Sequence, residues 1–499
     1  MKYWKFGVLA VVLVAGFIFF SQSGNYHVDS KNGKIHQKFN PSKANRSTAS
    51  DNDLIQSIND RIIAIKNRAE IKPLIEEIIR LSEQDSHRDN QTLKLYRAII
   101  EPMKHMESLI WRLREVVEKS GLMHMQALSM IRKAYYKDYM YGPHILAILD
   151  YLTMPSDTLL QFNRPEDIQE FANGELKSSL ENSLNLVQEV IANTDSDWSF
   201  SFDAYLASGY DPENNKVFIS EAKRFEKRVN HQYLYFIESN LHRVIGAIEF
   251  AVNYDINDYP RFVNQMVSKT AVNTLKKRLF LRSLPKPITP LEMIEAANDY
   301  RNFLTLRKSK EEAQANLSSS MEHFYQARVK ELVGFQKSID ETDHNNTDQY
   351  FLNPNILKIG REDKENNLKD KISLFEAAKA GSAKTITSEI TGQQIQIDMR
   401  ALFTPHENLR SFFPTPSGIN QAGGKGGNLE DENGDRIRHK ITGQTLFGWN
   451  YRYGKPLSFP DPTFGGFLPG ASNENIYDIA RTMELTGSLD HLKELIPLP

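Results

Sequence analysis

Apolar residues recur every three or four positions from Asp51 to about Asp340, which is the spacing of helices that bury one face. The first predicted helix carries its apolar stripe at Leu54, Ile58, Ile62 and Ile65. A later segment repeats the spacing at Phe225, Val229, Phe236, Leu241, Val244 and Ile248. We therefore expect a helical domain over residues 51–340, and a mainly α fold.

Local signals predict where several of these helices begin. In the sequence ITPLEM at 288–293, Thr289 can cap the free amides, Pro290 suits the first helical position and Glu292 completes a capping box. Other helices are expected to begin near Pro73, Asn90, Gly121, Pro143, Pro165 and Ser220. This makes roughly eight to ten helices of unequal length without a fixed repeat period. The pattern therefore favours an irregular multi-helix array, solenoid-like or a bundle, over a regular solenoid.

The pattern changes after residue 340. Residues 341–385 are polar and charged, and we interpret them as a linker that holds one short helical stretch. Isoleucines then alternate with polar residues on both sides of a Thr-Gly break, at Ile386, Ile390, Ile395 and Ile397. This predicts a hairpin. Proline, glycine and aromatic residues dominate from Pro405 to Gly470. We expect residues 386–499 to form a smaller α+β or irregular region that packs on the helical domain.

The N-terminal segment differs from the rest of the chain. Residues 3–20 are apolar apart from Lys5, and the only nearby charges, Lys2 and Lys5, precede most of the run. Positive charge resists translocation, so the rest of the chain should be exported. Residues 1–23 are either a signal peptide cleaved near Gly24 or a membrane anchor of about 27 Å, and the bulky end of the run favours the anchor. Residues 24–50 are polar and predict a flexible tether.

Composition narrows the functional classes. Hydrophobic residues make up 40% of the chain and charged residues 25%, which is enough apolar material for a sizeable core. The formal net charge of -2 lacks the basic character that nucleic-acid binding requires. The chain has no cysteine, which excludes disulfides, thiolate metal sites and a cysteine nucleophile. A large exported protein without disulfides fits a bacterial periplasm, and we expect no cofactor.

Two groups of residues could bind a metal ion. The first is a methionine and histidine cluster whose candidate Cu(I) ligands are His105, Met106, Met123 and His124. Methionine at helical spacing more often fills a core. The second is Asp431, Asn433 and Asp435, whose alternate oxygens are typical of calcium loops, but the twelve-residue EF-hand pattern is incomplete and Asn433-Gly434 is itself a turn signal.

Two further patterns bear on ligand binding. Trp449, Tyr451 and Tyr453 alternate, so a strand would place their rings on one face, where they could stack on a sugar or build an ordinary core. The glycine-rich residues 422–428 lack the Lys-Ser/Thr pair of a phosphate-binding loop, and we interpret them as a loop.

Catalytic residues are not identified by any motif. Neither GxSxG nor HExxH occurs, and Glu238 and His242, one helical turn apart, are a pair that chance produces on long helices. We therefore expect an exported, membrane-tethered scaffold or protein-binding module of the cell envelope, with an envelope protein as partner and no nucleic acid. The alternative is a periplasmic protein that binds or hydrolyses glycan through its aromatic C-terminal region. A copper-handling protein is the third interpretation.

Overall fold

The fold is mainly helical, as predicted, with a few short strands. The computed structural model describes residues 49–119, 143–203, 226–265, 296–340, 361–387 and 394–413, together with Gly392 and short stretches between 445 and 483. The first part of the chain forms α2 (Ala49–Ala64), η1 (Arg68–Glu70), α3 (Ile71–Ser82), η2 (Asp85–His87), α4 (Gln91–Ile100), η3 (Glu101–His105), α5 (Leu109–Arg112), α6 (Arg114–Lys119) and α8 (Pro143–Thr153).

The middle and C-terminal parts continue the helical array. They form α9 (Pro165–Phe171), η4 (Ala172–Leu176), α10 (Lys177–Ala192), β1 (Ser199–Asp203), β2 (Glu226–Asn230), α12 (His231–Ala251), α15 (Lys310–Asp340), α17 (Arg361–Lys379), β3 (Lys384–Thr387), β4 (Gln394–Ile397), α18 (Met399–Leu402), η6 (Leu409–Phe412), β5 (Thr445–Leu446) and β6 (Trp449–Asn450). The described strands pair as three separate antiparallel hairpins or ribbons, β1 with β2, β3 with β4 and β5 with β6.

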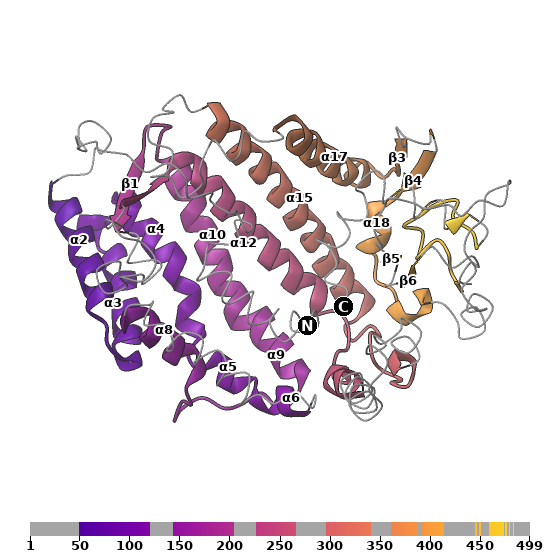
Figure 1. Cartoon of the computed structure of the whole chain (residues 1–499), viewed down its shortest axis with the longest axis horizontal. Helices are drawn as coiled ribbons and strands as arrows, with labels where there is room; N and C mark the ends of the chain where they lie inside the picture. The colour runs from indigo at the N-terminus through magenta and orange to yellow at the C-terminus, as the bar shows by residue number, and fades with distance from the viewer. Residues whose placement is uncertain are drawn as a thin grey trace, which may run out of the picture.

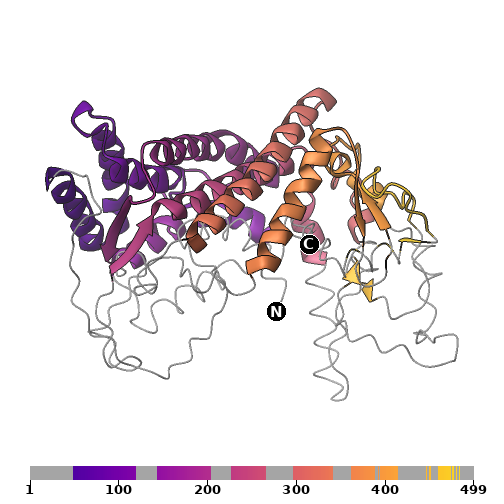
Figure 2. The same ribbon diagram turned by 90° about the horizontal axis from the view of Figure 1, so that it is seen from above.

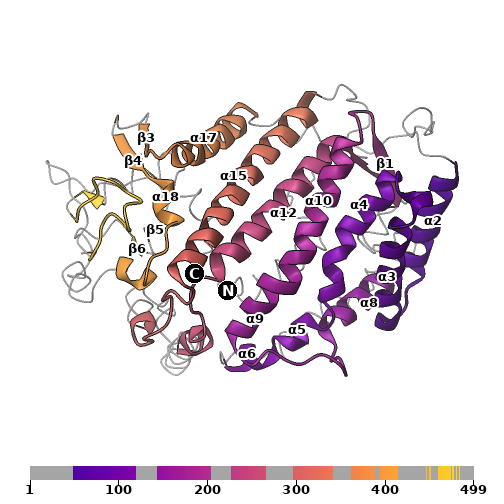
Figure 3. The ribbon, with the colours of Figure 1, turned by 180° about the vertical axis from the view of Figure 1, so that it is seen from behind.

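The long helices lie side by side in the order of the chain. Figures 1 and 3 show α4, α10, α12, α15 and α17 as successive neighbours, and each of these helices contacts the next. Seen from above in Figure 2, the indigo N-terminal helices and the orange and yellow C-terminal elements lie at opposite ends of the molecule. The result is the irregular helical array that the unequal helix lengths predicted.

Several predicted helix starts are confirmed. Asn90 caps α4 by accepting a 2.9 Å hydrogen bond from the amide of Leu93, and α8 and α9 begin at Pro143 and Pro165. The second helix, α3, begins at Ile71, two residues before the expected Pro73, since proline is tolerated anywhere in the first turn. The predicted starts near Gly121, Ser220 and Thr289 lie outside the described residues.

One predicted helix is shorter than expected. The spacing at Phe225 and Val229 suggested a helix, but Glu226–Asn230 form β2, which pairs with the alternating sequence SFSFD of β1. A single valine is compatible with a helix or with a strand, and the pairing of Val229 with β1 decides for the strand. Helix α12 begins only at His231, because the Asn230 side chain accepts a hydrogen bond from the amide of Tyr233.

The two longest described helices, α12 and α15, approach each other closely along what we call the α12–α15 seam. A Cβ added at Gly246 would lie 3.1 Å from the Cβ of His323 and 3.2 Å from the carbonyl oxygen of Ser320. The Ser320 hydroxyl donates a 2.7 Å hydrogen bond to the Gly246 carbonyl, and Ser239 donates one of 2.8 Å to that of Ala327. Small residues therefore permit the close packing, and hydroxyls hold the two backbones together.

Two large hydrophobic cores lie on either side of this seam. The first is built by α2 to α12 with side chains such as Leu93, Leu180 and Leu234. The second joins Leu317 and Phe324 of α15 to Phe375 of α17 and to the C-terminal region. The residues expected to form a linker thus include helix α17, which contributes to this core. The predicted hairpin is confirmed, since β3 pairs with β4 and places Ile386 opposite Ile395.

The prediction of a transmembrane protein is corrected here. No helix in the described part of the chain is long and apolar enough to cross a membrane. The longest, α15, spans 31 residues but carries charged side chains along its length, because it packs among other helices through only part of its surface. Residues 1–23, which prompted the prediction, lie outside the described residues.

Candidate functional site

An open groove runs beside α9 and η4, and we call it the α9 groove. Its volume is about 440 Å³, and its lining comes from three parts of the chain: Arg112 at the end of α5, the extended segment Leu160–Phe162, and α9 with η4. The lining side chains of α9 and η4 are Asp167, Glu170, Phe171 and Glu175, with Gly174 between the last two. The groove therefore combines aromatic, cationic and acidic surfaces.

The floor of the groove is a cation stacked on two aromatic rings. The guanidinium carbon of Arg112 lies 4.1 Å from the ring centre of Phe162 and 4.8 Å from that of Phe171. These two rings are themselves buried and lie 5.5 Å apart, with their planes tilted by 47°. Burial lowers the pKa of Arg112, and the nearby charge of Glu175 partly offsets this effect. The stacking keeps the guanidinium in place at the base of the groove.

Leu160 lies at the edge of the groove with 84% of its surface exposed. Its backbone is held on both sides by Arg112, whose Nε donates a 3.1 Å hydrogen bond to the Leu160 carbonyl and whose own carbonyl accepts 2.8 Å from the amide of Phe162. The exposed side chain is therefore presented by a fixed segment. Isolated surface leucines are common, but this one adjoins a groove whose aromatic floor is already ordered.

Carboxylates also line the groove. Asp167 is half-buried; burial raises its pKa, but the amides of Arg164 and Asn163 and the charge of Arg164 hold that pKa below its ordinary value overall. Glu170 and Glu175 each expose 63% of their side chains. Glu175 belongs to η4, a single π-helical turn, in which a Cβ at Gly174 would meet no atom within 4 Å. Such turns occur frequently at functional sites.

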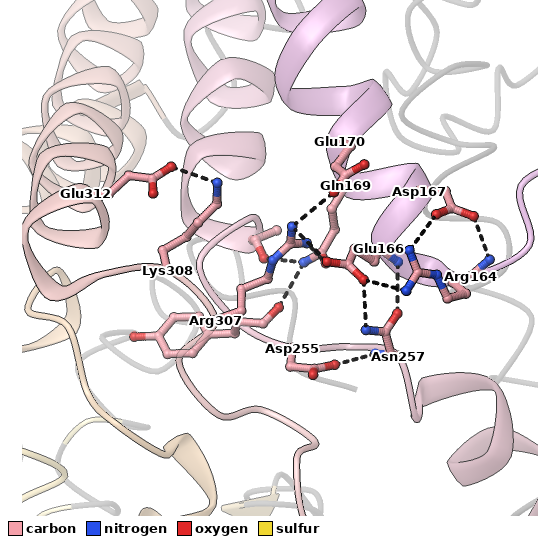
Figure 4. Close-up of polar contacts among 12 residues, drawn as sticks. Arg164, Glu166, Asp167, Gln169, Glu170, Asp255, Asn257, Arg307, Lys308 and Glu312 are labelled. Atoms are coloured by element: carbon pink, nitrogen blue, oxygen red, sulfur yellow. Dashed lines mark hydrogen bonds and ion pairs between the residues drawn. The ribbon is translucent and has the colours of Figure 1, made fainter.

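Helix α9 is fixed from behind by the polar network in Figure 4. The side-chain amide of Gln169 donates to the carbonyls of Ala251 and Tyr254 at 2.8 and 2.9 Å, and its oxygen accepts 2.7 Å from Arg307. Arg307 also pairs with Glu166 at 3.4 Å and Glu170 at 3.6 Å. These bonds fasten α9 to the end of α12 and to the segment that precedes α15, and Glu170 of this network also lines the groove.

A second polar cluster lies at the α12–α15 seam. Glu238 is fully buried and accepts from Lys330 at 2.9 Å and Gln188 at 3.0 Å through one oxygen, while its other oxygen has no hydrogen-bond partner. His242 lies 4.0 Å from Glu238 and faces His323, with their Nδ1 atoms 2.8 Å apart. The pair Glu238 and His242, dismissed as chance in the sequence, is thus buried together. This cluster lies between packed helices, away from the groove.

Of the four predicted copper ligands, the structure describes only His105 and Met106. Met106 is buried in the first core, and His105 faces outward, where its Nδ1 donates to Glu175 of the groove at 3.2 Å. Met123 and His124 lie outside the described residues. Within the described ranges, no three His, Asp or Glu side chains could together hold a metal ion.

The predicted aromatic platform is described only in part. The backbone of Trp449 belongs to β6, while the side chain of Trp449 and all of Tyr451 and Tyr453 lie outside the described residues. Residues 422–428 and 430–436, predicted to form a loop and a turn, lie outside them as well. The prediction of a glycan platform therefore stays a prediction.

Sequence reasoning missed the groove entirely. Arg112 lies about fifty residues before Phe162, so their contact depends on tertiary packing. The only local signal was Leu159-Leu160 in a segment without helical or strand periodicity, just before the predicted start of α9 at Pro165. Comparison with known proteins adds no candidate function: no protein-family model matches the chain, and no similar protein was found among curated sequences or solved structures.

Proposed function

We propose that this chain is a protein-binding module that takes up a short segment of another protein in the α9 groove. The observation that carries the proposal is Leu160, an apolar side chain left 84% exposed beside a groove, in a segment that Arg112 holds through the Leu160 carbonyl and the Phe162 amide. Covering this side chain with an apolar group of a partner removes its surface from water, which stabilises a complex. A site whose backbone is ordered beforehand loses less entropy on binding.

The form of the groove supports a macromolecular ligand rather than a small molecule. Small-molecule sites usually enclose most of the ligand surface, whereas the α9 groove is shallow and open to solvent. An open groove next to a helix suits an extended segment or a helix of a partner protein. The long polar network behind α9 supports the same function, because it keeps the binding face in one position.

The proposal places this binding outside the cytoplasm. The charged and apolar pattern of residues 1–23 predicts export, and we propose a signal peptide cleaved near Gly24, with an envelope protein as the partner. The acidic and apolar surface of the groove gives no reason to expect nucleic acid.

Photo-crosslinking from inside the groove tests the proposal. A photoreactive amino acid is placed at Gln161 of the full-length chain in native cells, and at Glu376 on the exposed face of α17 as the control position. We expect one polypeptide to be captured from position 161 and not from position 376, with the crosslink mapped by mass spectrometry to a single segment of it.

Substitution of Leu160 makes the test specific. Leu160→Asp should reduce the crosslink from position 161 at least tenfold, whereas Leu160→Met should retain it, because methionine offers similar apolar surface. The free energy of unfolding of both variants should lie within about 0.5 kcal/mol of that of the wild-type chain, since the side chain is exposed. The proposal is wrong if position 161 captures no polypeptide, or if capture is unchanged by Leu160→Asp.

A further inference from the structure

We infer that the segment bound in the α9 groove is extended and carries a lysine or arginine next to an apolar residue. This inference rests on the proposed function and adds the chemistry of the partner. Three features of the groove lead to it: the acidic side formed by Glu170 and Glu175, the stacked guanidinium of Arg112, and the apolar edge at Leu160.

The acidic side of the groove is available to a cation. Glu170 lies in the last turn of α9 and Glu175 in η4, and each exposes most of its side chain. Each has an intramolecular partner: one oxygen of Glu170 lies 3.6 Å from Arg307, and one oxygen of Glu175 lies 3.2 Å from His105. Arg307 is shared with Glu166 at 3.4 Å, so it compensates neither glutamate fully. The space at Gly174 is open, since a Cβ there would meet no atom within 4 Å, and it leaves room for a long cationic side chain to approach the two carboxylates.

Arg112 does not cancel this acidic character. Its guanidinium lies against the rings of Phe162 and Phe171, where the faces of the rings already stabilise its positive charge. The groove lining thus carries three carboxylates, those of Asp167, Glu170 and Glu175, against one guanidinium. Arg164 and Arg307 pair with Asp167 and Glu170, but both also pair with Glu166, so carboxylates still outnumber guanidiniums among these residues. A segment rich in acidic residues would be repelled, whereas a basic one is attracted.

Arg112 has a second use in the bound state. Guanidinium has five N–H donors in a fixed plane, and the contact with the Leu160 carbonyl uses only the Nε donor. The remaining donors suit the backbone carbonyl of an extended segment lying along residues 160–162. With an apolar side chain on Leu160 and a basic one between Glu170 and Glu175, such a segment meets all three surfaces of the groove.

Selection from a displayed library of random linear peptides tests the inference. The full-length chain is the target, and binding of individual peptides is then measured with the wild-type chain, with the Glu170→Gln/Glu175→Gln double variant, and with Glu376→Gln as a control on an exposed, distant surface. We expect enriched peptides to place Lys or Arg beside Leu, Ile, Met or Phe. The affinity of these peptides for the double variant should be about tenfold lower than for the wild type, mainly because association is slower, and it should depend less on salt concentration. The control should bind as the wild type does.

The outcomes separate this inference from the proposed function. If the enriched peptides lack a basic residue, or bind the double variant as tightly as the wild type, the inferred basic segment is wrong. A crosslink from position 161 would still support a protein-binding groove in that case. If no peptide is enriched although the crosslink depends on Leu160, the inference of an extended segment is also wrong, because the partner would then bind through a folded surface. Basic peptides that bind Leu160→Asp as tightly as the wild type show that Leu160 is not part of the binding surface, which contradicts both the inference and the proposed function.

Discussion

His242 and His323 face each other across the α12–α15 seam, and their contact limits how many protons the pair can hold. With Nδ1 atoms 2.8 Å apart, one nitrogen must donate and the other accept, so at most one Nδ1 carries a proton. Burial lowers the pKa of His242 to about 4. The charges of His323 and Lys330 act in the same direction, and the charge of Glu322 opposes them. Burial also lowers the pKa of His323. The folded state therefore keeps His242 neutral well below pH 6.5.

The free energy of unfolding should consequently fall as the pH is lowered from 6.5 to about 4. The unfolded chain binds a proton at His242 in this window and the folded chain does not, so acid favours unfolding. Stability from this residue is fully present above pH 6.5, and about 3 kcal/mol of it is lost by pH 4. In His242→Gln, chemical denaturation at a series of pH values should show a flatter dependence over this window.

Ser239→Ala is the matched control for that experiment. It removes the hydrogen bond to the Ala327 carbonyl in the same seam, which costs about 1 kcal/mol, but it removes no titrating group. Its stability should fall by the same amount at every pH. If His242→Gln keeps the wild-type slope between pH 4 and pH 6.5, the histidine pair does not govern the acid sensitivity.

At the scale of the helix, two glycines that lie within helical segments have opposite roles. Gly174 in η4 has open space around it, whereas Gly246 in α12 lies against His323 and the Ser320 carbonyl of α15. Alanine at Gly174 should raise the free energy of unfolding by about 0.5–1 kcal/mol, because it lowers the entropy of the unfolded chain. Alanine at Gly246 should lower it by about 1 kcal/mol, and valine by about 3 kcal/mol, because the seam cannot accept added volume.

Thermal and urea unfolding of these three variants measure the effect. The same Gly→Ala change at the two sites is its own control for helix propensity, so a difference in sign isolates the packing of the seam. Stabilisation by alanine at both positions would show that α12 and α15 can separate slightly without cost.

Elements with local signals could be predicted, and elements defined by tertiary contacts could not. Asn90 and Pro165 mark the starts of α4 and α9 because caps and first-turn prolines act within a few residues. Val229 could not be assigned to β2 because the partner strand lies 25 or more residues earlier in the chain. The α9 groove was hidden for the same reason, since Phe162, Phe171 and Arg112 meet only when α5, the extended segment and α9 have packed together.

At the scale of the whole molecule, α12 contributes to both large cores and α15 to the second. Leu317 and Phe324 of α15 pack in the second core, and so does the partly buried Phe250 of α12, while other residues of α12, such as Leu234 and Leu241, build the first. Buried hydrogen bonds at the seam tie the two helices together. A fragment that ended at residue 340 would keep its helices but expose Leu317 and Phe324 to solvent. The helical domain is therefore less independent than its sequence pattern indicates.

Phe375→Ala tests whether the two cores unfold together. Phe375 of α17 is 1% exposed and lies 6.2 Å from the ring of Phe403, so its truncation should lower the free energy of unfolding by about 3–5 kcal/mol. In a chain that carries Trp4→Phe and Trp449→Phe, fluorescence reports on Trp111 and Trp198. Trp198 packs against Phe200 of the first core.

If the cores are coupled, Phe375→Ala shifts the urea midpoint of this fluorescence as far as it shifts the midpoint of far-ultraviolet circular dichroism, because one cooperative transition moves both signals together. The exposed neighbour Glu376→Ala on the same helix should move neither midpoint appreciably. An early loss of helical signal with an unchanged tryptophan transition would instead mean that α17 and the C-terminal region unfold on their own. The α9 groove, which is built on the first core, would then stay intact without them, and binding by the groove should survive mild denaturation that removes the second core.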